Sequence, residues 1–309
     1  MITRTQFTDG FLETALPALN AVTLERFNRY PDQFPELFKV ETSNQSIEQF
    51  TQVTGFGIMT ELAEGEPIGF DEPLQAYNKT YRHRKFGKGY KITQEAIDDD
   101  KHRFLKDCAS NLGRSADETV EIEAALIWNR GFNASYTGPD GKTLFATDHP
   151  RVGGGTQANR PSVAADLDIP SLEAALTTFG GWTDHRSKLI RIPAKTLVVH
   201  RANAFNASEI LGSTLKSDTA NNAINAFKDK KHGMGLMDYF VYQYLTDEDA
   251  WFLVGDTSSA DYRIRFFWRK KFATMSYPDP EIDGYKTMGR LRMSVGWDDW
   301  LGAYGSPGA

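Results

Sequence analysis

The stretch GKGYKITQEAIDDD at residues 87–100 marks the point at which the character of the chain changes. Before it, glycines interrupt segments rich in strand-forming residues; after it, no proline occurs as far as Arg130. Apolar residues then recur every three or four positions, namely Ile97, Leu105, Cys108, Leu112, Ala116, Val120, Ala124 and Ile127. The passage predicts an extended segment that leads directly into one long amphipathic helix capped by Thr93, with Gly113 as the point where it could bend.

This helix is longer than the chain needs for a core of its own. Over residues 93–130 it would span roughly 55 Å at the usual rise per residue. Such a rod is typical of a scaffold that neighbouring molecules share.

Residues 54–92 predict a long, partly exposed β-hairpin with separated charges. Its outgoing limb carries the acidic residues Glu61, Glu64, Glu66, Asp71 and Glu72. Its returning limb carries the basic residues Lys79, Arg82, Arg84, Lys85, Lys88 and Lys91. Two interpretations stay open, two solvated faces of one hairpin or an intersubunit docking strip. The residues that we assign to an interface as a hypothesis are Glu61, Glu64, Glu66, Arg82, Arg84, Lys85 and Lys88.

The segments on either side predict an α+β fold. Residues 1–45 form an arm with one amphipathic helix between Phe11 and Phe27. An irregular but ordered loop of about 30 residues follows Gly131, because Gly, Pro, Asp and Asn are dense there. Beyond it we expect helices at 171–183 and 202–211, strands at 195–200 and near Phe240, Ala250 and Phe266, and a loosely held tail, GAYGSPGA.

Composition excludes several classes of protein. The net charge of −6 argues against a dedicated DNA-binding module, so any contact with DNA should be weak and local. A single cysteine, Cys108, cannot form an intramolecular disulfide or a cysteine-based zinc site, which favours a reducing cytoplasm. No signal-like start and no run of 18 apolar residues occurs, so we expect neither export by a signal peptide nor a membrane span.

Catalytic and ligand motifs are weak, and we predict no catalytic, cofactor-binding or metal-binding residues. GPDGKT at 138–143 lacks the first glycine of a Walker loop and follows a helix, so it predicts a turn. Asp148 and His149 could serve a hydrolase, but a loop-capping aspartate and a surface histidine are favoured. Successive aspartates at 98–100 diverge on a helix, and the six histidines include no pair four residues apart.

The cationic triplet 269–271 lies between Trp268 and Phe272. A contact with DNA is one interpretation of it. A protected strand edge or an interface is the favoured one, because charges on an edge strand prevent unwanted pairing.

Five stretches in this order resemble the major capsid proteins of tailed bacteriophages with the HK-ninety-seven-type fold, in particular the Mu-like major head subunit family. They are GKGYKITQEAIDDD at 87–100, GKTLFATDHPRVGGGTQAN at 141–159, AKTLVVHRANAFNASEIL at 194–211, YLTDEDAWFLVGD at 244–256 and GWDDWLGAYGSPG at 296–308. The resemblance covers nearly the whole chain.

The resemblance implies a division of the chain into the parts of a capsid subunit. These parts would be an N-terminal arm (1–45), an extended loop (46–92), a peripheral domain with its spine helix (93–160), an axial domain (161–262) and a C-terminal segment that completes both domains (263–309). The best-known member of the fold has a long N-terminal scaffolding segment, whereas about 45 residues precede the extended loop here. Assembly would then need a separate scaffold protein, or none.

The function implied is structural rather than enzymatic. Subunits would assemble with themselves into hexamers and pentamers and then into an icosahedral virion shell around double-stranded DNA, in the cytoplasm of the bacterial host. Further partners would be scaffold, portal and decoration proteins, and no membrane. The alternatives are an encapsulin-type nanocompartment shell, which shares the fold, and a hydrolase that uses Asp148 and His149.

Overall fold

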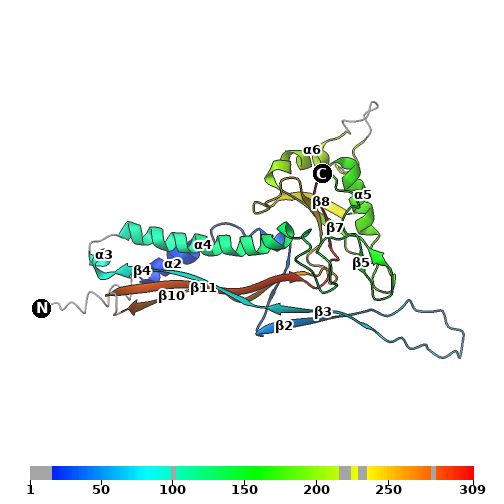
Figure 1. Cartoon of the computed structure of the whole chain (residues 1–309), viewed down its shortest axis with the longest axis horizontal. Coiled ribbons are helices and arrows are strands. Elements are labelled where there is room, and N and C mark those ends of the chain that lie inside the picture. Colours follow the sequence, from blue (N-terminus) through cyan, green and yellow to red (C-terminus); the bar gives the residue numbers. More distant parts are fainter. Residues whose placement is uncertain (1–15, 99–101, 216–223, 229–234, 280–282) are drawn as a thin grey trace.

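The structure has an elongated part built on long strands and a compact part at one end (Figure 1). A thin loop projects from the same end of the molecule. The computed structural model describes residues 16–98, 102–215, 224–228, 235–279 and 283–309. Helices and strands occur in both parts, so the predicted α+β class is confirmed.

The elongated part is organised by a four-stranded sheet, here called the long sheet, with strand order β1-β10-β11-β4. Its strands are β1 (Lys39–Thr42), β10 (Ile264–Asp279), β11 (Gly284–Trp297) and β4 (Arg84–Thr93). β1 runs parallel to β10, and the other neighbours are antiparallel. Alternate residues of β11 are buried, as a sheet covered on one face requires.

Two helices cover one face of the long sheet (Figure 1). They are α2 (Leu16–Phe27) and α4 (His102–Asn129). Along the chain, η2 (Phe34–Glu36) follows α2, and α3 (Gln94–Asp98) precedes α4. The predicted apolar stripe of α4 is buried, including Leu105, Leu112 and Val120.

The predicted helix from Thr93 to Arg130 is confirmed for Gln94–Asp98 (α3) and for His102–Asn129 (α4). Thr93 is the last residue of β4, and the amide of Gln94 donates to the carbonyl of Asp283. α3 and α4 lie on either side of residues 99–101, which are outside the described residues.

α4 runs through Gly113 without interruption. A Cβ at Gly113 would lie 2.3 Å from the carbonyl oxygen of Thr23, so the glycine allows close packing of α2 rather than a bend.

The N-terminal segment is fixed to α4 by the buried carboxylate of Glu121. It accepts hydrogen bonds from the amides of Gln33 (2.6 Å) and Phe34 (3.3 Å) and from the Tyr242 hydroxyl (3.1 Å). Burial raises the pKa of Glu121 despite these donors. The predicted helix of the arm is confirmed for Leu16–Phe27, while its predicted start near Phe11 lies outside the described residues.

The extended loop is paired only at its base. β2 (Ile47–Val53) pairs antiparallel with β3 (Gln75–Arg82), and residues 54–74 between them contain no helix or strand. The returning chain then leaves β2 and joins the long sheet as β4. The prediction of one hairpin over residues 54–92 is therefore wrong in extent, because the second half of the returning limb pairs with β11.

The compact part contains a second four-stranded sheet, of order β12-β9-β7-β8. Its strands are β12 (Ala303–Ser306), β9 (Trp251–Gly255), β7 (Ala194–Val199) and β8 (Gly235–Val241). The helices beside it are α5 (Ile169–Gly180), η3 (Arg201–Asn203) and α6 (Ala204–Gly212). Asp168 caps α5 by accepting from the amide of Ser171 at 2.7 Å. The predicted helices and strands of this part are confirmed within a few residues.

The C-terminal tail is an edge strand of this second sheet, so the expectation of a loose tail is wrong. All four residues of β12 are buried. The amide of Gly305 donates to the carbonyl of Asn159, and the amide of Ala309 donates to Asp166. Glycine is needed at 305, because a Cβ there would lie 2.9 Å from the Phe252 ring.

Candidate assembly interface

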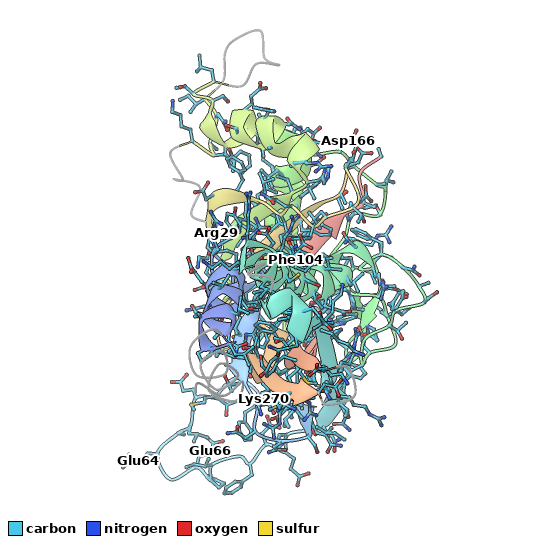
Figure 2. All side chains as sticks on the ribbon, turned by 90° about the vertical axis from the view of Figure 1, so that its left-hand side faces the viewer. Arg29, Glu64, Glu66, Phe104, Asp166 and Lys270 are labelled. Atoms are coloured by element: carbon cyan, nitrogen blue, oxygen red, sulfur yellow. The ribbon has the colours of Figure 1, made fainter. Side chains whose placement is uncertain are left out.

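The tip of the extended loop, residues 54–74, is exposed almost throughout. Large apolar side chains project from it, with Met59 96% exposed and Phe70 98% exposed. Glu61, Glu64 and Glu66 are exposed on the same segment, and Glu64 and Glu66 lie at the outer limit of the molecule (Figure 2). A patch of this kind is typical of a surface that another molecule covers.

The base of the loop is fixed to the long sheet by a buried polar cluster. The Asp298 carboxylate accepts from Arg265 Nε at 2.6 Å and from the hydroxyl of Tyr81, and Arg265 also pairs with Glu41 at 2.7 Å. Burial, followed by the charge of Asp298, raises the pKa of Tyr81 well above its usual value. Phe50 of β2 packs on Arg265, with the guanidinium 4.4 Å from the ring centre.

The middle of the loop is held against the compact part. Arg186 pairs with Asp71 at 2.8 Å, and Lys188 donates to the carbonyl of Phe56. Asp71 accepts from the amide of Gly57 at 2.7 Å, and this bond is the main reason that its pKa is lowered. The path of the loop is thus specified within one subunit before any partner binds.

The sequence-predicted interface residues are not brought together within one chain. The acidic set lies on the tip, whereas Arg82 ends β3 and Arg84, Lys85 and Lys88 lie on β4. Arg84 pairs with Glu123 of α4 at 2.5 Å, while Lys85 and Lys88 are exposed. The two sets do not lie on one hairpin, since these lysines pair with β11, but both sets are exposed as the interpretation of solvated faces expects. The docking interpretation stays a prediction.

Sequence reasoning missed two cations that lie beside Lys85 in the long sheet. Lys270 of β10 and Arg292 of β11 are register partners, and Arg292 is also paired with Lys85. Residues so far apart in sequence give no sign of this pairing. The favoured interpretation of residues 269–271 as a protected edge fits the structure, because β1 pairs with β10 only as far as Trp268 and bulges follow.

The two candidate catalytic residues, Asp148 and His149, have different hydrogen-bond partners. The side chain of Asp148 is 52% exposed and bonds to Lys142, whereas the His149 ring is fully buried and bonds to Asp140 Oδ2 at 2.6 Å. The expectation of a surface histidine is wrong. His149 stacks on Trp300, with ring centres 4.7 Å apart, and reaches Asn159 at 3.0 Å. The loop from 138 to 159 uses this side chain as an internal anchor.

The other predicted motifs have simple structural roles. GPDGKT forms a turn in which the amide of Gly138 donates to the carbonyl of Lys142 at 2.6 Å and Gly141 has φ of 76°. Among the described residues there is no group of three His, Cys, Asp or Glu side chains that could hold a metal ion. No helix in the same residues is long and apolar enough to cross a membrane.

Comparison with protein families decides what kind of chain this is. The family model described as "Phage capsid protein" matches residues 77–306, from β3 to β12. The chain belongs to this phage capsid protein family. Among curated proteins, none matches it in sequence.

Several solved structures with a similar fold are capsids of bacteriophages or related particles. The procapsid of bacteriophage JBD30 is 15% identical with a TM-score of 0.52, and the match covers 99% of this chain and 76% of that one. The capsid of an empty GTA particle is 13% identical with a TM-score of 0.52, covering 88% of each chain. The virus-like particle from Pyrococcus furiosus is 9% identical with a TM-score of 0.52, covering 95% and 99%.

At these identities the likeness concerns the fold, which is the predicted HK-ninety-seven-type capsid fold. Together with family membership it makes this capsid protein a major head subunit that forms the shell of a virion. The family match favours a phage capsid over the encapsulin-type alternative and points to a structural protein rather than a hydrolase.

Proposed function

We propose that this capsid protein assembles through its extended loop into hexamers and pentamers, and that these close into an icosahedral shell around double-stranded phage DNA. The observation that carries the proposal is the exposed tip of residues 54–74, which combines apolar side chains with acidic ones and is paired only at its base. In an isolated subunit this segment buries no apolar surface and so adds no stability. Neighbours in a ring can cover it.

The domain boundaries that we propose are those that the family resemblance implies. Residues 1–45 are the arm, 46–92 the extended loop, 93–160 the peripheral domain, 161–262 the axial domain, and 263–309 complete both. Support comes from β10 and β11, which lie in the long sheet beside β4, and from β12, which lies in the second sheet beside β9.

We also infer that scaffold, portal and decoration proteins are separate partners and that assembly takes place in the bacterial cytoplasm. One JBD30 capsid of this fold is decorated with minor capsid protein trimers; it is 13% identical, with a TM-score of 0.52, and the match covers 70% of this chain and 92% of that one. With a net charge of −6, contact between this subunit and packaged DNA would be weak and local.

The test replaces cations of the proposed docking strip with glutamate, which reverses their charge. Arg82, Lys85 and Lys88 are exposed, whereas Arg84 is engaged with Glu123, so the variant is R82E/K85E/K88E. We expect the assembled fraction at fixed concentration to fall at least about tenfold, because like charges would face each other across the interface.

The matched control is R103E/K106E/R201E, which changes net charge equally at exposed cations away from the strip. Both variants should keep the circular dichroism spectrum of the wild type. Normal shells from R82E/K85E/K88E would contradict the docking strip.

A further inference from the structure

A pocket lies where the base of the extended loop meets the end of α4. Its volume is about 340 Å³, and its walls come from β3, β4, β11, α4 and the residues just after α4. The apolar part of its lining is formed by Phe86, Leu126, Ile127, Met293 and Val295. A concave site of this size with a few convergent polar groups is typical of a site for a small ligand.

The charged groups of this pocket are mostly cationic. Four cations, Lys79, Arg82, Arg84 and Arg130, line it together with one carboxylate, that of Glu123. This carboxylate already pairs with Arg84 at 2.5 Å. Within the part of the chain that the structure describes, no carboxylate forms an ion pair with any of the other three cations. The pocket therefore has an excess of positive charge that an anion would neutralise.

Aromatic rings position two of these cations without neutralising them. Lys79 Nζ lies 5.1 Å from the centre of the Trp297 ring, and the Arg130 guanidinium lies 4.5 Å from the centre of the Tyr136 ring. A ring attracts a cation through its quadrupole but has no net charge. Both cations are thus in place before an anion binds, which lowers the entropic cost of binding.

Lys79 is the cation that an anion would stabilise most. Burial lowers the pKa of its ammonium group, although the carboxylates of Asp298 and Asp140 act in the opposite direction. Both carboxylates have other partners, because Asp298 accepts from Arg265 at 2.6 Å and Asp140 bonds to His149 at 2.6 Å. A partly buried cation without a paired anion is unfavourable, so the pocket should attract an anionic ligand.

We propose that this pocket is a binding site for a phosphate-type oxyanion, with Lys79 and Arg130 as the groups that hold it. The planar guanidinium of Arg130 can donate two parallel hydrogen bonds to such a group, and Lys79 adds a compact positive charge. Arg82 is exposed at the same pocket and strengthens the positive potential. The site goes beyond the proposed function, because it does not depend on which surface mediates assembly.

Two sources could supply this chemistry, a free inorganic phosphate or diphosphate and a phosphate of a nucleic-acid backbone. The lining favours neither source, since its cations meet phosphate oxygens and make no contact that would select a base. The experiment therefore uses one probe for each source, sodium pyrophosphate and a short single-stranded oligothymidylate.

Melting curves of the full-length protein test the proposal. We expect about 10 mM pyrophosphate to raise the melting temperature of the wild type by at least about 3 °C relative to sodium chloride of equal ionic strength. The variant K79M replaces the ammonium group with an apolar side chain of similar length. Without the probe it should melt no lower than the wild type, because the unpaired cation is gone. Titration calorimetry should show an affinity for pyrophosphate at least about tenfold weaker than that of the wild type.

K106M is the matched control, because Lys106 is an exposed lysine of α4 outside the lining of this pocket. Phosphates also stabilise proteins by exclusion from their surface, and K79M and K106M share this general effect. R130M is a second variant, which should weaken binding as K79M does and keeps the test decisive if K79M does not fold.

An equal response of the wild type, K79M and R130M to pyrophosphate would overturn the proposal. A wild type that does not respond, together with a destabilised K79M, would also overturn it, since Lys79 would then serve only to pack on Trp297. If K79M binds both probes more weakly, a nucleic-acid backbone can supply the phosphate. If only pyrophosphate binding is weaker, the site belongs to a free anion.

Discussion

The ring of His149 has hydrogen-bond acceptors on both sides. Nδ1 faces the Asp140 carboxylate and Nε2 faces Asn159 Oδ1. The Asn159 orientation is fixed, because its nitrogen donates to the carbonyls of Leu144 and Ala303 while its oxygen accepts from the amide of Ala146. Asn159 connects residues 138–159 to β12, through its hydrogen bonds with Ala303 and Gly305.

Replacement of His149 by alanine should lower the free energy of unfolding by about 3–5 kcal/mol, since it leaves the Asp140 carboxylate buried without its partner. Urea denaturation of the folded subunit measures this loss. Asp148→Ala is the control and should change the free energy by less than about 1 kcal/mol, because Asp148 forms only a solvent-exposed pair. Equal stability of H149A and wild type would contradict the anchor.

The raised pKa of Asp117 in α4 predicts that the stability of the subunit depends on pH. Burial, and then the charge of Asp32, raise its pKa from 3.8 to about 6. The folded state therefore keeps this proton at a pH at which the unfolded state has lost it, so the stabilising contribution is full below about pH 4 and is lost as the pH rises through 6.

Asp117→Asn should make the subunit more stable than the wild type at pH 7.5, by about 1–2 kcal/mol after allowance for partial exposure. At pH 3.5 the two proteins should differ little. Denaturation at both pH values tests this expectation, and a variant that is equally stabilised at the two values would refute the assignment to Asp117.

At the scale of elements, Arg186 and Lys188 hold the extended loop against the compact part. The Arg186–Asp71 pair is partly exposed, so it contributes little to global stability. Arg186→Ala should leave the melting temperature within about 2 °C of the wild type while hydrogen exchange in residues 55–72 becomes several-fold faster. Arg191→Ala, at an exposed neighbouring cation, is the matched control. Unchanged exchange in R186A would show that the pair does not hold the loop.

The C-terminal strand, unlike the Arg186–Asp71 pair, should contribute strongly to global stability. β12 is wholly buried and pairs with β9, so removal of residues 303–309 should lower the melting temperature by at least about 10 °C or prevent folding. Removal of Ala309 alone should shift it by less than about 3 °C. A melting curve of the truncated chain that matches the wild type would contradict this role of β12.

These elements show what local sequence predicts. Periodicity predicted α4, α5 and α6, because each has one buried stripe. The glycines of GAYGSPGA suggested a loose tail, although Gly305 is there to admit Phe252 and Phe145. The partner of β4 could not be predicted, since it is β11, almost 200 residues later. The sequence shows two oppositely charged sets, the acidic tip and the cations Arg82, Arg84, Lys85 and Lys88. Their separation in space could not be predicted, because it depends on the pairing of β4 with β11.

The whole molecule is shaped for use in an assembly. A thin loop leaves one end, and a long helix and long strands form much of the rest (Figure 1). The chain belongs to the phage capsid protein family, and an assembly of like subunits is the setting in which we expect these features to be covered.

Negative-stain electron microscopy of the purified protein, with and without neighbouring head proteins, tests the central claim most directly. The account predicts capsomer rings, tubes or closed shells, with interfaces of the obligate type. A monodisperse monomer under every condition would contradict it.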